Sequence, residues 1–129
     1  MKNLILPMLI CLFTFSTINA TDSSFETNTE NIEIVKIYEL SSFCKLIQMG
    51  DYEAVKALIK SGEDVNKKSN GLTPLMFAAR HNKAKIAKLL IDNGAKLKTK
   101  SDKGGKLTAL QMAERSKAID TIKVIKEAL

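Results

Sequence analysis

The chain has 129 residues, enough for one small domain and too few for two. It contains no Trp, five Phe and two Tyr, so an interior must be built from aliphatic side chains, which favours stacked helices over a β-sandwich. The net charge of +6 is uneven: residues 21–66 hold nine acidic and four basic side chains, and residues 67–129 hold fifteen basic and five acidic ones. The second half therefore either attracts an anionic partner or is a solvated lysine-rich surface.

Residues 1–20 have the three-part layout of a secretory signal peptide. A basic start precedes an apolar run from Leu4 to Phe15, and small polar residues then lead to Ala20 at the cleavage position. The apolar run is short for a spanning helix, although a retained membrane anchor stays open as the alternative. We therefore expect export to the periplasm or secretion, a mature chain that starts at Thr21, and no stable membrane insertion after cleavage.

The two cysteines fall on opposite sides of the expected cleavage site. Cys11 would be lost with the leader, and the bulky Ile10 before it argues against lipid attachment. Cys44 would remain without a partner for an intrachain disulfide. We interpret Cys44 as a small buried side chain, with a redox role as the alternative.

Residues 21–35 form a polar spacer and lead-in. The first part, residues 21–31, is polar and has no apolar periodicity, which is typical of a loop. Residues 32–40 are rich in apolar side chains, and their pattern fits either a short strand or the start of a helix.

From Leu40 onward, apolar residues recur with helical spacing in paired runs, and the pairs themselves repeat. The pattern returns after 32 residues and again after a further 35, with the extra residues in the loop 101–106. The matching positions include Phe43 with Leu75 and Leu110, Val55 with Ala87 and Ile122, and Leu58 with Leu90 and Ile125. Periods of this size indicate stacked supersecondary units.

The middle unit carries the clearest helix boundaries. Gly71 permits a tight turn, Thr73 suits the N-cap of a helix, and Pro74 suits the first helical position, where a missing N–H costs nothing. Gly94 follows the second apolar run, where a left-handed residue would end the second helix.

These residues resemble the ankyrin-repeat family. The motif-bearing stretches are Gly71–Ala79, with the letters G-L-T-P-L-M-F-A-A, and Ile86–Ala95, with the letters I-A-K-L-L-I-D-N-G-A. The resemblance implies an all-α fold, an ankyrin-repeat solenoid of helix-turn-helix units joined by hairpin-like loops. It would cover residues 36–129 in units of 36–67, 68–100 and 101–129.

The chain departs from the family pattern at several positions. Met76 stands where the family usually has His, Asn82 replaces the Gly between the helices, and Ala109 replaces the Pro of the third unit. The third unit resembles a terminal cap, so we expect its outer residues Lys117, Lys123, Lys126 and Glu127 to face water. We expect burial of Leu58, Leu90 and Ile125 to contribute most to stability.

The sequence offers little for catalysis. His81 is the single histidine, and no Cys-His motif or metal-ligand cluster accompanies it. The run Lys103–Lys106 lacks the spacing of a phosphate-binding loop and is typical of a hairpin tip. We therefore expect no enzyme activity, no cofactor and no metal.

The resemblance implies binding to another protein through the hairpin tips and the exposed face of the first helix of each repeat. We expect Arg80, His81 and Arg115 to line one concave basic surface able to bind carboxylates, although each residue alone is also consistent with plain solvent exposure. The candidate partner-binding residues are Gln48, Met49, Ser69, Asn70, Leu72, Arg80, His81, Asp102, Lys103, Arg115 and Ser116.

Our leading hypothesis is an exported, monomeric module that binds, protects or inhibits an envelope protein through this concave basic face. The alternative is binding of an anionic surface, either lipid head groups or nucleic acid, through the lysine-rich C-terminal half. Nucleic acid is the less favoured ligand because the sequence offers no aromatic stacking platform. Redox protection through Cys44 is a third possibility.

Overall fold

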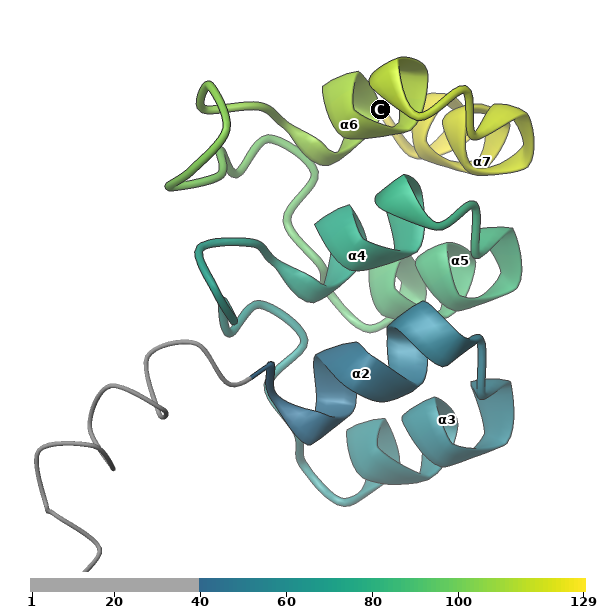
Figure 1. Ribbon diagram of the computed structural model, residues 1–129. Coiled ribbons are helices and arrows are strands. Elements are labelled where there is room, and N and C mark those ends of the chain that lie inside the picture. The colour runs from purple at the N-terminus through teal and green to yellow at the C-terminus, as the bar shows by residue number, and fades with distance from the viewer. Residues whose placement is uncertain (1–39) are drawn as a thin grey trace, which may run out of the picture.

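The computed structural model describes residues 40–129, which form three helix pairs stacked along one axis (Figure 1). The signal peptide, the spacer and lead-in, and the first residues of the first unit were predicted for segments outside the described residues. The helices are α2 (Ser42–Met49), α3 (Tyr52–Lys60), α4 (Pro74–Arg80), α5 (Ala84–Asp92), α6 (Ala109–Arg115) and α7 (Ile119–Ala128).

The pairs form two layers, with α2, α4 and α6 in one and α3, α5 and α7 in the other (Figure 1). Residues 40–129 contain no strand beyond one isolated antiparallel bridge between Ser69 and Leu72. No helix in this part of the chain is long and apolar enough to cross a membrane. The expected all-α solenoid is confirmed.

Side-chain N-caps define where α4 and α6, two helices of the first layer, begin. The Thr73 hydroxyl accepts a hydrogen bond from the Met76 N–H at 3.3 Å, and Pro74 opens α4 as expected. Thr108 caps α6 in the same way, and the Gln111 side chain accepts from the Thr108 N–H at 3.0 Å to complete a capping box.

Met76 takes a role of its own at the start of α4. Its sulfur accepts a hydrogen bond from the Thr73 N–H at 3.4 Å and so completes the capping box of α4. In the third repeat the Gln111 side chain fills this role, and the thioether sulfur of Met76 is a weaker acceptor than the Gln111 amide oxygen. The Met76 side chain is fully buried.

The core is continuous through the three pairs and mostly aliphatic, as expected, but it also contains the aromatic side chains of Phe43 and Phe77. Ala78 and Ala79 have no exposed surface, which lets the helices of the first layer approach closely. Leu90 and Ile125 are also fully buried, as expected. Leu58 is only half-buried, and the fully buried position of α3 belongs to Val55, because the inward face of this helix is centred one turn earlier.

The third repeat lies at one end of the described stack (Figure 1). Lys117, Lys123, Lys126 and Glu127 are all exposed, as expected for the outer face of a terminal unit. Gly94, with a φ of 92°, ends α5 in the left-handed conformation that the sequence predicted.

Candidate functional site

A groove lies between the ends of α4 and α6 and the loops that precede these helices. It has a volume of about 450 Å³. We call it the basic groove, and its lining residues are Asn70, Leu72, Arg80, Lys103, Gly104, Leu107, Met112, Arg115 and Ser116.

Two arginines occupy equivalent positions in neighbouring repeats. Arg80 is the last residue of α4 and Arg115 is the last residue of α6, so the stacking of these helices aligns the two side chains along the groove. A cation at a helix C-terminus is also favoured by the helix dipole. Both arginines are exposed, and neither forms an ion pair with any residue in the range 40–129.

The floor beneath these cations is apolar. Leu72 and Met112 are each 9% exposed, and Leu107 is half-buried beside them. The groove therefore combines a cationic rim with an apolar base.

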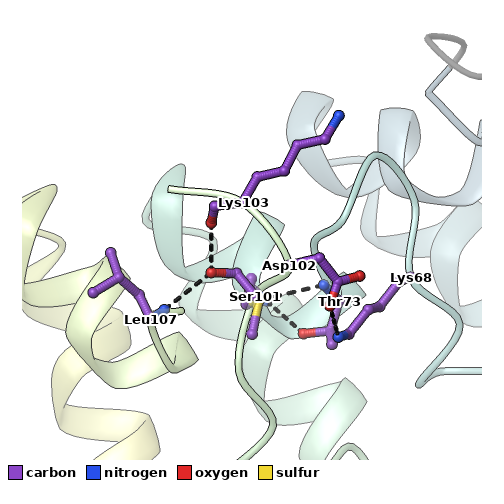
Figure 2. Close-up of polar contacts among 7 residues, drawn as sticks. Lys68, Thr73, Ser101, Asp102, Lys103 and Leu107 are labelled. Atoms are coloured by element: carbon purple, nitrogen blue, oxygen red, sulfur yellow. Dashed lines mark hydrogen bonds and ion pairs between the residues drawn. The ribbon is translucent and has the colours of Figure 1, made fainter. Parts of the chain in front are cut away.

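The loop from Ser101 to Leu107 forms one wall of the groove, and a single buried hydroxyl holds its shape (Figure 2). The Ser101 hydroxyl donates to the Lys103 carbonyl at 2.7 Å and accepts from the Leu107 N–H at 3.0 Å. The Ser101 N–H also donates to the Leu107 carbonyl at 2.9 Å, which closes the base of the loop.

The same loop is attached to the hairpin of the preceding repeat. The Asp102 N–H donates to the Gly71 carbonyl at 2.9 Å, and the Asp102 carboxylate pairs with Lys68 at 2.6 Å (Figure 2). The Lys103 ammonium donates to the Asn70 side-chain carbonyl at 2.9 Å. These contacts place Lys103 at the edge of the groove, although the exposed ion pair itself adds little stability.

The hairpin tip of the middle repeat is a two-residue turn. Asn70 and Gly71 have φ values of 51° and 79°, as a type I′ turn between Ser69 and Leu72 requires. A Cβ on Gly71 would lie 3.3 Å from the Cβ of Asp102, so glycine also allows the two loops to approach.

The groove brings together six of the residues that the sequence analysis selected. These are Asn70, Leu72, Arg80, Lys103, Arg115 and Ser116. The remaining five do not line it. They are Gln48 and Met49 at the exposed end of α2, Ser69, His81 and Asp102.

Ser69 requires a correction. It was selected as a contact residue at the hairpin tip, but it is buried, and its hydroxyl accepts a hydrogen bond from the Ser41 N–H at 2.9 Å. Leu72 is also buried at the base of the turn, so Asn70 is the exposed side chain of this tip. Leu72 contributes to the site as part of the floor.

His81 adjoins Arg80 at the end of α4. Partial burial lowers the pKa of the His81 imidazole, and the positive charges of Arg80 and Lys83 lower it further. His81 is therefore mostly neutral at pH 7 and adds little charge to the basic surface.

Cys44 lies in the core, with no exposed surface. Burial raises the pKa of its thiol, which disfavours the reactive thiolate. This environment supports the interpretation of Cys44 as a packing residue.

Sequence reasoning missed three lining residues, Gly104, Leu107 and Met112. Leu107 could have been found from the sequence, because it lies 35 residues after Leu72 at the equivalent position of the next repeat. Residues 40–129 contain no group of three or more His, Cys, Asp or Glu side chains placed to hold a metal ion.

The fold and groove define a helical repeat protein built from stacked helix-turn-helix units. The chain belongs to the ankyrin-repeat family, since the family model for ankyrin repeats in three copies matches residues 43–128. Ankyrin repeats are protein–protein interaction modules, generally without enzyme activity.

Two relatives are similar in sequence. A putative ankyrin repeat protein of Rickettsia bellii is 36% identical over 77 residues, which is 56% of this chain and 11% of that protein. Putative ankyrin repeat protein FPV031 of Fowlpox virus is 34% identical over 76 residues, which is 57% of this chain and 22% of that protein. The alignments thus span a tenth to a fifth of the length of these relatives.

Two solved structures are similar in fold. The crystal structure of the human ASB11 ankyrin repeat domain matches with a TM-score of 0.63 and 27% identity, covering 68% of this chain and 39% of that chain. A chain from the structure of the predatory endopeptidase Bd0816 of Bdellovibrio bacteriovorus in complex with immunity protein Bd3460 matches with a TM-score of 0.63 and 30% identity, covering 70% of this chain and 47% of that chain.

Proposed function

We propose that this protein is exported and binds an envelope protein through the basic groove, so as to protect or inhibit that protein. The observation that carries the proposal is the aligned pair Arg80 and Arg115 above an apolar floor. Guanidinium groups bind carboxylates in a bidentate manner, and a partly apolar surface adds contact energy when water leaves it.

The similarity to a chain of an endopeptidase–immunity protein complex supports a protective or inhibitory role. The signal-like pattern of residues 1–20 supports export. Neither argument depends on the other, so each has its own experiment.

Export is tested by expressing the full-length coding sequence with a C-terminal tag in a bacterium that has a periplasm. We expect the tagged protein in the periplasmic or secreted fraction, with a mass that corresponds to a start at Thr21. Recovery in the cytoplasm with residues 1–20 intact would contradict export.

Partner binding is tested by capture from an envelope extract of the organism from which the sequence comes. The wild-type protein is compared with Arg80→Gln/Arg115→Gln and with a matched control, Lys85→Gln/Lys123→Gln. The control removes two exposed positive charges from α5 and α7, in the other layer. We expect one discrete protein to be retained by the wild type and the control and lost by the arginine variant.

Circular dichroism establishes that all three proteins are folded before the comparison. Retention of the same partner by the arginine variant would overturn the assignment of the groove as the binding site. No partner for any of the three proteins would overturn the proposed function itself.

A second candidate function is binding of an anionic surface. Five exposed lysines in the segment before α6 favour it: Lys96, Lys98, Lys100, Lys103 and Lys106. Binding to anionic lipid vesicles or nucleic acid that falls steeply with added salt, and that the arginine variant retains, would support this candidate over the first.

A further inference from the structure

We infer that the basic groove recognises an extended acidic segment of its partner, in which two carboxylates flank an apolar side chain. This inference rests on the proposed function, because it takes the basic groove to be the partner site. It adds the chemistry that the partner must present.

The charge of the groove has one sign. Among the described residues that line it, Arg80, Lys103 and Arg115 carry charged side chains, and all three are basic. Lys103 is held at the edge by Asn70, whereas the two arginines have no carboxylate partner within residues 40–129. A partner that brings two carboxylates would supply the acceptors that the guanidinium groups favour.

The spacing of the arginines matches an extended chain. Helices in contact, as α4 and α6 are, lie roughly 8–10 Å apart. An extended segment advances about 3.3 Å per residue, so two acidic residues two or three positions apart can each reach one arginine.

The apolar floor of the groove favours an apolar side chain between the two carboxylates of the partner. Leu72, Leu107 and Met112 offer an apolar surface that an aliphatic or aromatic side chain of the partner would cover. The groove volume of about 450 Å³ can hold a few side chains of a partner segment, but not a folded domain. The combination of cations and apolar floor favours an acidic peptide segment over a bare phosphate group, which would gain nothing from the floor.

The test uses a capped, fluorescein-labelled peptide in which a Leu-Leu pair is flanked on each side by two glutamates. One control peptide replaces the glutamates with glutamines, and a second replaces the leucines with serines. Fluorescence anisotropy measures binding of each peptide to the protein produced from the full-length coding sequence. The same peptides are then titrated against Arg80→Gln/Arg115→Gln and Lys85→Gln/Lys123→Gln.

We expect saturable binding of the acidic leucine peptide to the wild type and to the lysine control. Binding should weaken by about tenfold or more with the glutamine peptide or the arginine variant, because two charge-assisted hydrogen-bonded pairs are lost. The serine peptide should bind several-fold more weakly, because the floor stays uncovered.

Equal binding of the acidic and the glutamine peptides would overturn the inference, as would equal loss of binding in the arginine variant and the lysine control. Equal binding of the leucine and serine peptides would overturn the part played by the floor. The envelope capture separates the two proposals: a partner lost by the arginine variant, with no binding of the acidic peptide, leaves the proposed function standing and removes this chemistry. Binding of the acidic peptide without any captured partner would support the chemistry inferred for the groove and remove the proposed envelope partner.

Discussion

At the scale of single residues, Asn82 shows how one departure from the family pattern is used. It occupies the turn between α4 and α5 with a φ of 50°, the left-handed region in which Asn is the best tolerated residue after Gly. Its side-chain carbonyl accepts from both the N–H and the hydroxyl of Thr121, each at 3.2 Å, and its amide donates to Asp120 at 3.2 Å. Asn82 therefore caps α7, a helix that has no side-chain cap of its own.

Replacement of this residue tests the cap. We expect Asn82→Ala to lower the free energy of unfolding by about 1–3 kcal/mol, because the buried Thr121 hydroxyl loses its acceptor and Ala is strained at a positive φ. Urea unfolding followed by circular dichroism measures the change. Asn82→Gly loses the same hydrogen bonds without the strain, so it should lie between Asn82→Ala and the wild type. A wild-type midpoint for both variants would contradict a capping role.

His81 carries the pH-dependent prediction at this scale. Its pKa is lowered, so between that value and the ordinary histidine value the unfolded chain binds more protons than the folded one. The stability that this residue contributes is therefore lost as the pH falls through this window.

The titration of His81 is directly measurable, since it is the single histidine of the chain. We expect an NMR titration to place its pKa below the ordinary value of about 6.5, and Arg80→Gln to raise it by removing a nearby positive charge. An unchanged pKa in Arg80→Gln would mean that burial and Lys83 cause the shift without Arg80. The Lys123→Gln variant serves as the control, because the charge that it removes is not among those that shift the His81 pKa.

At the scale of elements, the loop between α5 and α6 is ordered by hydrogen bonds rather than by regular secondary structure. Ser101, which is 2% exposed, connects both sides of the loop through one hydroxyl. The longer loop of the third repeat thus keeps a defined shape and holds Lys103 and Gly104 against the basic groove.

We expect Ser101→Ala to cost about 1–3 kcal/mol of stability, because the Leu107 N–H loses its side-chain acceptor and the Lys103 carbonyl loses a donor. Amide hydrogen exchange should also become faster across residues 102–106. Ser116→Ala is the matched control, since this serine lies exposed on the same groove. Unchanged exchange in Ser101→Ala would show that the contacts with the preceding hairpin suffice to order the loop.

At the scale of the whole molecule, stability depends on contacts between neighbouring repeats. The middle pair, α4 and α5, packs against both of the others, whereas the outer pairs have one described neighbour each. In a stacked array, a defect in the middle repeat weakens two interfaces at once.

Leu90 lies in this middle pair and is fully buried. We expect Leu90→Ala to cost about 2–5 kcal/mol, a large fraction of the stability of a small domain. Thermal unfolding followed by circular dichroism should show a strongly lowered midpoint and one transition. Ile119→Ala, at a position that is 69% exposed, should leave the midpoint nearly unchanged. A small effect of Leu90→Ala would contradict the stacked core.

Most of the fold was predictable because its determinants are local or periodic. The Thr73 cap, the Pro74 start and the Gly94 stop are signals within a few residues, and the 32- and 35-residue offsets bring equivalent positions into neighbouring repeats. Arg80 and Arg115 were selected from the resemblance to ankyrin repeats, and the 35-residue offset places them at equivalent positions in neighbouring repeats. The burial of Ser69 did not follow from it, because its partner Ser41 lies 28 residues away.

The sequence by itself determined the repeat unit, the helix boundaries and the largely aliphatic core, because hydrophobic periodicity and capping act over a turn or a helix. Only the tertiary structure decided which side chains meet between repeats: Leu72 and Met112 in one floor, Asp102 against Gly71 and Lys68, and Asn82 at the start of α7. These contacts join residues about 30 to 40 positions apart. They depend on how each repeat is rotated and shifted against the next, and the packing of the whole stack sets that geometry.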